Sequence, residues 1–357
     1  MSSHLDLNQD SSRSVATTVV EAGRDGGPWP SGGSCVRAIQ VSEYGGPEVL
    51  VPVELPDPQA GEGEVVVRAE AVDTIYVETQ IRRGWGPRFG INPPYVPGGA
   101  AAGTVVSTGP GVSPSWVGRR VVAGAGTRGS YAELVRAAVD RLVPVPNGLD
   151  LREAAALAHD GVTGTAIIER AGITPGDRVL ILGAAGGMGT LLVQLARSLG
   201  AQVVGAARGE DKLTLVRQLG ADAAVDYTES GWTDSVRHAF GGLPVDVLLD
   251  GVGGDLGSEA FHLVADGGRV SAHGAASGDF ATIDATDAHA RGIVLRGITD
   301  VQFEASEMTR LAGTALAGAA EGLMRPVIAR TYPLSSAQEA HRAMEARAIS
   351  GKALLIP

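Results

Sequence analysis

The fold is decided by the stretch Val179-Leu180-Ile181-Leu182-Gly183-Ala184-Ala185-Gly186-Gly187-Met188-Gly189, which an amphipathic run from Thr190 to Leu199 follows. An apolar strand, a glycine-rich turn and the start of a helix succeed one another here, as in a dinucleotide-binding βαβ unit. Backbone N–H groups of such a turn and the positive end of the helix dipole bind the pyrophosphate of a dinucleotide. We therefore expect this turn to bind a nicotinamide cofactor.

The next expected strand indicates which nicotinamide cofactor is bound. In NAD-binding units, a carboxylate about 20 residues beyond the glycines accepts a hydrogen bond from the ribose 2′-hydroxyl. Here the run Gln202–Ala207 ends at Arg208, and Lys212 lies one helical turn further on. A guanidinium at this position would pair with a 2′-phosphate, which favours NADPH over NADH. The alternative is that Arg208 is only a solvated loop charge.

Strands and helices alternate in the second half of the chain, which predicts a parallel sheet covered by helices on both faces. Six expected strands complete a doubly wound α/β fold. Helices are expected to start near Thr190, Asp211, Thr233 and Leu256, and an alanine-rich helix is expected at 305–322. The expected strands are Val179–Leu182, Gln202–Ala206, Ala223–Val225, Val247–Leu249, Arg269–Ala272 and Val294–Ile298.

Short β runs broken by turns occupy the first half of the chain and predict a barrel-like β module. The tail at 326–357 returns to β runs around a helix at 336–346, and we expect it to rejoin this module. Residues 1–35 are rich in Ser, Asp and Gly and are expected to form a disordered extension. The expected strands of the module are Glu64–Ala69, Gly103–Ser107, Arg120–Ala123, Tyr131–Val135 and Leu142–Val145.

Composition limits the possible classes of protein. With 357 residues, 44% of them hydrophobic, the chain is long enough for two packed domains. Its net charge of −11 repels nucleic acid and anionic membranes, so we expect neither as a partner. The single cysteine, Cys35, cannot form an internal disulfide. Since the sequence shows no signal peptide and no membrane span, we expect a cytoplasmic protein.

Six segments carry a family pattern: Glu43-Tyr44-Gly45-Gly46-Pro47-Glu48-Val49-Leu50, Gly129-Ser130-Tyr131-Ala132-Glu133, Gly183–Gly189, Gly220-Ala221-Asp222, Asp250-Gly251-Val252-Gly253-Gly254 and Gly351-Lys352. Through them, the chain from about residue 36 to its end resembles the zinc-independent quinone oxidoreductase branch of the medium-chain dehydrogenase/reductase superfamily. No single segment decides the resemblance, but their order and spacing together are highly specific.

The resemblance implies an α/β protein of two domains with the active-site cleft between them. A GroES-like β-barrel catalytic domain would span 36–160 and be completed by 325–357, and a Rossmann NADPH-binding domain with a doubly wound parallel sheet would span 161–324. It also implies a homodimer formed through the edge at Val294–Ile298.

The resemblance further implies contacts of single residues with the cofactor. Thr163, Val252, His273 and Gly274 would lie near the nicotinamide, and Lys352 would close over the cofactor from the tail. The remaining contacts are Gly183, Gly186, Gly187, Met188 and Gly189 around the pyrophosphate, and Arg208, Lys212 and Tyr227 at the 2′-phosphate.

The sequence departs from the pattern of zinc-dependent relatives. Those carry a Gly-His-Glu near the start and four clustered cysteines, whereas this chain has one cysteine and the stretch Pro97-Gly98-Gly99-Ala100-Ala101-Ala102-Gly103. A catalytic zinc needs three good nitrogen, sulfur or oxygen ligands, so we expect no metal site. This branch usually has an acid where Ala100 stands and an asparagine where Asp73 stands.

Without a metal to polarise a carbonyl, reduction is easiest for acceptors that already stabilise added electron density. Quinones and α,β-unsaturated carbonyls are such acceptors. The protein must align the nicotinamide with the acceptor and supply a proton or a hydrogen bond to the developing oxyanion. We therefore predict an NADPH-dependent oxidoreductase that transfers hydride to a quinone or an α,β-unsaturated carbonyl, a small apolar electrophile.

Two residues are candidate proton donors for this reaction. The phenol of Tyr76 could hydrogen-bond an enolate oxygen, or Tyr76 is a packed aromatic residue. His159, in Ala158-His159-Asp160-Gly161, could donate a proton, or it is a structural histidine between the domains. Four aromatic residues indicate an apolar substrate wall or ordinary loop packing. They are Tyr44, Trp85, Phe89 and Tyr95.

Other functions stay open at this point. The chain is alternatively a specialised biosynthetic enoyl or enone reductase, or an enzyme of this superfamily that catalyses a non-redox reaction. From a different class, an NADPH-binding sensor or regulator without turnover fits the phosphate-binding turn equally well. Binding and hydride transfer depend on different residues, so the turn does not separate these functions.

Overall fold

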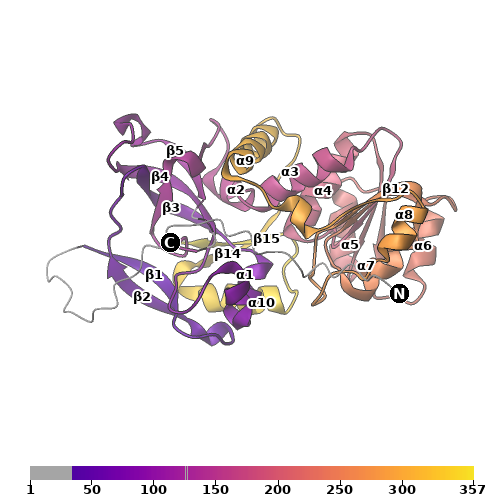
Figure 1. Cartoon of the computed structure of the whole chain (residues 1–357), viewed down its shortest axis with the longest axis horizontal. Helices are drawn as coiled ribbons and strands as arrows, with labels where there is room; N and C mark the ends of the chain where they lie inside the picture. Colours follow the sequence, from indigo (N-terminus) through magenta and orange to yellow (C-terminus); the bar gives the residue numbers. More distant parts are fainter. Residues whose placement is uncertain (1–33, 125, 127) are drawn as a thin grey trace.

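Two domains make up the protein, and the computed structural model describes residues 34–124, 126 and 128–357. Figure 1 shows a β-rich domain, here called the barrel domain, beside a domain of alternating strands and helices, here called the Rossmann domain. The extension predicted to be disordered spans 1–35, and residues 1–33 of it lie outside the described residues. Strand β1 (Cys35–Val41) begins one residue before the expected boundary. In the described part of the chain, no helix has the length and apolar character of a membrane span.

A wholly parallel six-stranded sheet forms the centre of the Rossmann domain as described. From one edge to the other its strands are β10 (Ala223–Asp226), β9 (Gln202–Ala207), β8 (Arg178–Leu182), β11 (Val245–Asp250), β12 (Val264–Ala272) and β13 (Val294–Arg296). Chain order reverses beside β8, and open α/β sheets bind ligands at the carboxyl ends of strands at such a point. The six expected strands are confirmed, although β13 stops at Arg296 because a 3-10 turn begins at Ile298.

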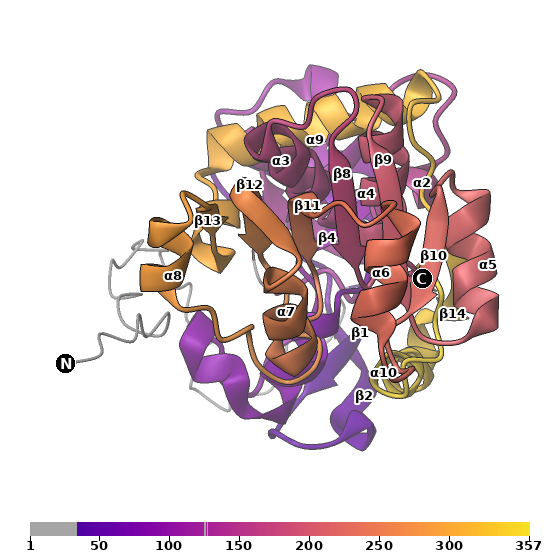
Figure 2. The same cartoon turned by 90° about the vertical axis from the view of Figure 1, so that its right-hand side faces the viewer.

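Helices cover both faces of this sheet. Successive side chains along a strand point to opposite faces, and apolar side chains lie on both of them. Val179 and Ile181 of β8 pack with α3 (Asp160–Ala171), α4 (Gly187–Ser198) and α5 (Glu210–Gln218). Leu180 and Leu182 pack on the other face with α6 (Trp232–Ala239), α7 (Gly254–Phe261) and α8 (Ala285–Ala290). Figure 2 shows the strands side by side with these helices around them.

Four Rossmann helices begin one to three residues earlier than expected, at Gly187, Glu210, Trp232 and Gly254. In the structure each helix is preceded by a glycine, and three of these glycines have positive φ angles that only glycine adopts readily. The four preceding glycines are Gly186, Gly209, Gly231 and Gly253.

The barrel domain is organised around β3 (Glu64–Asp73), which pairs with three other strands. These are β4 (Ala100–Thr108), β6 (Leu134–Ala138) and the tail strand β15 (Lys352–Ile356). The same sheet contains β5 (Arg120–Gly124), β7 (Leu142–Pro144) and β14 (Ile328–Pro333), while β1 pairs separately with β2 (Leu50–Pro56). Figure 1 accordingly shows the yellow tail among indigo strands, with α10 (Ala337–Glu345) beside them.

One expected barrel strand is displaced along the chain. The strand predicted at Tyr131–Val135 lies at Leu134–Ala138. Tyr131 donates its backbone N–H to the Pro97 carbonyl at 2.9 Å, and its own carbonyl accepts from Ile39 N–H at 2.9 Å. The segment before Leu134 therefore bridges other parts of the barrel before the chain pairs with β3.

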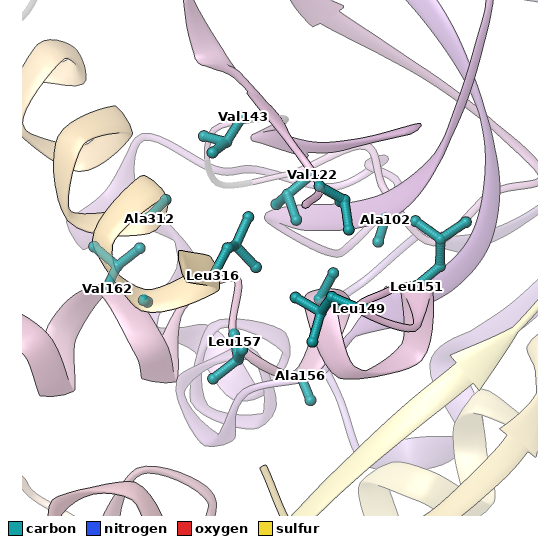
Figure 3. Packing of buried hydrophobic residues seen from close by; sticks show 14 of the residues in the cluster. Ala102, Val122, Val143, Leu149, Leu151, Ala156, Leu157, Val162, Ala312 and Leu316 are labelled. Atoms are coloured by element: carbon teal, nitrogen blue, oxygen red, sulfur yellow. The ribbon is translucent and has the colours of Figure 1, made fainter. Parts of the chain in front are cut away.

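An apolar cluster joins the two domains. It lies between strands of the barrel, the short helix α2 (Leu151–Ala156), α3 and α9 (Ala305–Ala320). Figure 3 shows Leu316 and Ala312 of α9 and Val162 of α3 near Val122 and Val143 of the barrel strands. Because these side chains are buried, the cluster fixes one domain against the other and so positions the cleft between them.

Candidate functional site

A cavity of about 360 Å³ lies between the domains and is lined from both sides. The barrel domain contributes Thr74, Ile75 and Tyr76 to the lining. The tail residues that line the cavity are Met344, Arg347, Ile349, Gly351, Lys352 and Ala353. Thr163 and Gly274 are not among the described lining residues. The predicted cofactor residues that do line it are Gly183, Gly186, Gly187, Met188, Gly189, Arg208, Lys212, Tyr227, Val252, His273 and Lys352.

The glycine-rich turn presents backbone to this cavity. Gly183 has a φ of 71°, a left-handed conformation that favours glycine. A Cβ on Gly189 would overlap the Gly183 carbonyl, so the close turn requires glycine there. Helix α4 follows from Gly186, and no described side chain caps it. Because the first N–H groups of a helix lack internal partners, this turn suits a pyrophosphate.

Cationic side chains gather at one end of the cavity. Arg208, Lys212 and Arg347 line it together with Tyr227, and Lys212 Nζ donates to the Arg347 carbonyl at 2.8 Å. Burial and the charges of Arg208 and Arg347 lower the pKa of Lys212. A phosphate would satisfy this concentration of positive charge.

Arg347 was not predicted from the sequence. It follows α10 in a left-handed conformation, with a φ of 56°. Its guanidinium donates to the Ala276 carbonyl of the Rossmann domain and lies 3.9 Å from the centre of the Tyr76 ring. No local motif marks Arg347, because the fold brings it to the cavity from the far end of the chain.

Tyr76 lines the cavity, whereas His159 is not among its described lining residues. His159 precedes α3, and its side chain remains 25% exposed. The four aromatic residues predicted as a substrate wall also lie away from the described lining. Tyr44 donates to the Ile91 carbonyl at 2.7 Å, and Trp85 lies under the Arg88 guanidinium. The Phe89 side chain is half-exposed, and the Tyr95 side chain is buried.

Four charged or titratable side chains meet beside the cavity, and two of them, Asp160 and Lys352, line it. Lys352 Nζ lies 2.8 Å from Asp73 Oδ1 and 3.0 Å from Asp160 Oδ2. The other oxygen of Asp73 lies 2.6 Å from His159 Nδ1. We call Asp73, His159, Asp160 and Lys352 the lysine cluster. The sequence singled out three of these residues for other reasons, but it gave no sign of Asp160, which adjoins His159 in the chain.

The pKa values within the lysine cluster reflect these contacts. Burial alone would lower the pKa of Lys352, but Asp160 and Asp73 raise it more, so Lys352 stays charged. Burial likewise acts to lower the pKa of His159. The hydrogen bond and the charge of Asp73 outweigh burial, so the pKa of His159 is raised. Burial raises the pKa of Asp160 despite the nearby Lys352.

His273 places a neutral imidazole beside the cavity. It follows β12, and its Nδ1 lies 3.1 Å from Ser271 Oγ. Its Nε2 is buried without a hydrogen-bond partner in the described residues. Burial lowers the pKa of His273 to about 4, so the ring is uncharged near neutral pH. The sequence had assigned His273 to the cofactor loop without indicating this buried side chain.

A second buried network supports the segment that carries Tyr76. Tyr131 donates to Glu78 Oε2 at 2.7 Å, and Glu78 also accepts from the Ile75 backbone N–H at 3.1 Å. His341 Nε2 lies 3.0 Å from the Tyr131 hydroxyl, and Arg82 donates to His341 Nδ1 at 3.4 Å. We call these residues the Glu78 network. It joins α1 (Tyr76–Gln80) to α10.

Within the described ranges, no group of three or more His, Cys, Asp or Glu side chains is arranged to hold a metal ion. The stretch Pro97–Gly103 runs into β4, and a Cβ on Gly99 would lie 2.8 Å from His159 Nε2. The imidazole of His159 therefore packs against Gly99, at the position where the zinc-dependent relatives were expected to carry a histidine.

The chain is similar to known proteins along most of its length. Residues 187–313 match the zinc-binding dehydrogenase family, and residues 61–147 match the alcohol dehydrogenase GroES-like domain. A quinone oxidoreductase of Rattus norvegicus is 34% identical over 87% of this chain and 94% of the relative. A 2-haloacrylate reductase of a Burkholderia species is 32% identical over 90% of this chain and 99% of the relative.

Solved structures have the same two-domain fold. A mycobacterial protein complexed with NADPH superimposes with a TM-score of 0.82, at 33% identity, over 90% of this chain and 100% of that one. Together with the matched domains, this likeness identifies the two sheets as a GroES-like domain and a Rossmann domain. This protein is an oxidoreductase, and it belongs to the quinone oxidoreductase branch of the medium-chain dehydrogenase/reductase superfamily.

Proposed function

We propose that this protein is an NADPH-dependent enzyme that reduces a quinone or an α,β-unsaturated carbonyl. The observation that carries the cofactor assignment is one cavity with a glycine-rich turn and three cations, Arg208, Lys212 and Arg347. The turn suits the pyrophosphate, and the cations suit a 2′-phosphate, which distinguishes NADPH from NADH. The NADPH complex of the mycobacterial relative supports this choice.

The acceptor class rests on the names of relatives and on the lining of the cavity. The relatives include a quinone oxidoreductase and a 2-haloacrylate reductase, and both names denote conjugated acceptors. Ile75, Val252 and Leu256 supply apolar lining, which suits a flat apolar molecule. When bound, NADPH supplies hydride from its nicotinamide. The chain's own task is to align the acceptor and stabilise the oxygen that gains negative charge.

Tyr76 is the first candidate for the hydrogen-bond donor to that oxygen. It lines the cavity, and the guanidinium of Arg347 stacks on its ring. His159 is the second candidate. It lies outside the described lining, where Asp73 holds its Nδ1 and its Nε2 faces Gly99.

Replacing Tyr76 by Phe removes the hydroxyl and keeps the ring beneath Arg347. If the phenol assists the reaction, kcat should fall by about 100-fold or more, within the range for a lost acid or oxyanion donor. NADPH affinity should change little, and fluorescence titration of NADPH checks this. Unchanged kcat in Y76F would remove Tyr76 from the mechanism and leave His159 as the donor.

The direct test of the acceptor class is to follow NADPH absorbance with purified protein and a panel of quinones, enones and enoyl thioesters. We expect consumption with at least one of these classes, and the reduced product identifies which. A specialised biosynthetic enzyme would consume NADPH with one class and exclude the others. Binding of NADPH without consumption by any class would contradict the proposal.

The same proposal covers the domain boundaries, the compartment and the oligomeric state of the protein. The domains divide at 36–160 with 325–357 and at 161–324, and the protein acts in the cytoplasm. It forms a homodimer through the edge strand β13, where Val294 is 46% exposed. Light scattering from the purified protein measures the mass, and a monomer at micromolar concentration would contradict the dimer.

A further inference from the structure

Lys352 is already paired inside the free protein. Its ammonium lies between the carboxylates of Asp73 and Asp160 at 2.8 and 3.0 Å. The exposed fractions of the Lys352 and Asp73 side chains are 5% and 0%, and that of Asp160 is 18%. Lys352, which the resemblance places over the cofactor, is thus ion-paired within the chain.

The lysine cluster lacks one positive charge when His159 is neutral. It then holds two carboxylates and one ammonium, and a proton on His159 balances the set. Groups on several elements face His159: Asp73 of β3, Lys352 of β15, Glu78 of α1 and the neighbouring Asp160. Among these, Asp73 holds the imidazole directly at 2.6 Å.

The lysine cluster adjoins the predicted pyrophosphate turn. A Cβ on Gly187 would overlap the Asp160 carboxylate and would lie 3.2 Å from Lys352 Cδ. The backbone N–H of Gly351 donates to the Ala185 carbonyl at 2.8 Å, which ties the start of β15 to the same turn. A carboxylate and an ammonium therefore stand directly against the backbone on which the pyrophosphate would rest.

An anionic pyrophosphate at this turn must act on both side chains. It repels the Asp160 carboxylate and attracts the Lys352 ammonium away from Asp73 and Asp160. Each carboxylate then loses part of its cationic partner, and a second positive charge beside the pair becomes more favourable. The nearest group able to supply that charge is His159, through Asp73.

We propose that the lysine cluster couples binding of the cofactor to uptake of one proton, with Asp160 and Lys352 as the residues that sense the pyrophosphate. This proposal rests on the proposed NADPH dependence. It also gives the site a chemical advantage. Reduction consumes NADPH, one proton and the acceptor and yields NADP⁺ and the doubly reduced acceptor, so the proton that the balance requires enters with the cofactor.

The coupling makes NADPH affinity depend on pH in a defined direction. Asp73 raises the pKa of His159 in the free protein even though burial lowers it, and loss of Lys352 from the cluster raises it further. Uptake is therefore small at low pH, where His159 is already protonated, and largest between the free-state pKa of His159 and its higher pKa in the complex with NADPH. In that window the Kd for NADPH rises by up to about tenfold per pH unit.

The experiment is isothermal titration of the full chain with NADPH at a series of pH values from 7.5 to 9.5, in several buffers of different ionisation enthalpy at each pH. The slope of the observed heat against that enthalpy counts the protons taken up. This range lies well above the second pKa of a phosphate monoester, about 6, so the 2′-phosphate contributes little. The variants are His159→Gln and Asp160→Asn, with thermal unfolding as a check that each folds. Asp266→Asn is the matched control, because its side chain is 80% exposed.

We expect proton uptake in the unmodified protein and in D266N to pass through a maximum approaching one proton within this pH series, and to be almost absent in H159Q at every pH. D160N removes a negative charge beside the pyrophosphate, so NADPH should bind about tenfold more tightly at pH 8 and with less proton uptake. Binding with no proton uptake in the unmodified protein, or full uptake in H159Q, would overturn the coupling and leave the proposed reductase intact. No NADPH binding at all would overturn both.

Discussion

Glu78 is a carboxyl buried among polar partners rather than beside a cation. Only 5% of the residue is exposed, and its partners in the Glu78 network are a tyrosine hydroxyl and a backbone N–H. Burial raises the pKa of Glu78 from 4.5 to about 7 although both hydrogen bonds lower it. The network therefore holds α1, and with it Tyr76, through a group that titrates near neutral pH.

Glu78 should make stability fall as the pH rises. The folded pKa is above the unfolded one, so the folded state binds the extra proton and its advantage is lost between pH 4.5 and 7. The loss is about 3 kcal/mol for a shift of this size. Urea unfolding of the unmodified protein and E78Q from pH 5 to 8 measures it as a change in their difference in stability.

The comparison of the two proteins isolates Glu78 from other titrating groups. Burial and the nearby Arg82 lower the pKa of His341 to about 3, so His341 makes stability fall on acidification, which is the opposite sign. That contribution is common to both proteins and cancels. Parallel stability curves for the two proteins would show that Glu78 does not titrate in this range.

Arg208 should determine the choice between NADPH and NADH. Replacing Arg208 by Asp removes one cation from the phosphate pocket and adds an anion, so NADPH affinity should fall by about 100-fold, given charge-assisted contacts of about 1.5–3 kcal/mol. NADH affinity should stay within a few-fold. Arg237→Asp is the control, because Arg237 is exposed on α6 and pairs with Asp234 outside the cavity.

Fluorescence titration of both cofactors measures these affinities. Equal losses for NADPH and NADH would mean that Arg208 supports the fold of the pocket rather than contacting a phosphate. An unchanged preference for NADPH in R208D would mean that Arg208 is only a solvated loop charge. Lys212 and Arg347 would then be the phosphate ligands.

Single residues were predictable from the sequence where a local motif carries them. Arg208 and Lys212 follow the glycine-rich turn at a fixed spacing, and both line the cavity. Arg347 was missed because it comes from the tail and reaches the cavity only through tertiary folding. The pairing of Lys352 with Asp73 was also missed, since these residues are neighbours only because β15 pairs with β3.

The element on which the site depends most is the strand–turn–helix unit of β8 and α4. The turn between β8 and α4 is tight. A Cβ on Gly189 would overlap the Gly183 carbonyl and lie 2.8 Å from Ala184 Cα. Backbone atoms cannot move aside as a flexible side chain can. The unit therefore tolerates only glycine at this position.

Gly189→Ala should abolish measurable NADPH binding and lower the melting temperature. Overpacking of this kind costs about 1–3 kcal/mol. Gly164→Ala is the matched control in α3, where the added methyl group would meet Met188 and Leu192 at ordinary contact distances of 3.7 and 3.8 Å. G164A should keep its affinity for NADPH and gain up to about 1 kcal/mol from helix propensity. Normal binding by G189A would mean that the turn relaxes to accept a side chain.

Elements were predictable where the apolar pattern is simple. The apolar runs of the parallel sheet predicted all six Rossmann strands. Such runs are nearly continuous because helices cover both faces of the sheet. Helix starts were placed too late, because the sequence shows the first apolar turn more clearly than the glycine before it. The strand at Leu134–Ala138 was misplaced because hydrogen bonds to Ile39 and Pro97 hold Tyr131 outside the sheet.

At the scale of the whole molecule, the tail closes the cavity between the two domains. Arg347 donates to the Ala276 carbonyl, Lys212 donates to the Arg347 carbonyl, and Gly351 N–H donates to the Ala185 carbonyl. Each of these bonds joins the tail to the Rossmann domain, while β15 continues into the barrel sheet. The sequence indicated that the tail returns to the barrel, but the long-range bonds that make it a wall of the site have no local signature.

The measurement that tests the central proposal most directly is steady-state consumption of NADPH and NADH with one quinone or enone acceptor and product analysis. One equivalent of acceptor should be reduced for each NADPH consumed. The value of kcat/KM should be at least about tenfold higher for NADPH than for NADH, which corresponds to about 1.4 kcal/mol from the cationic pocket. Equal use of the two cofactors, or NADPH that binds but is never consumed, would contradict the proposed function.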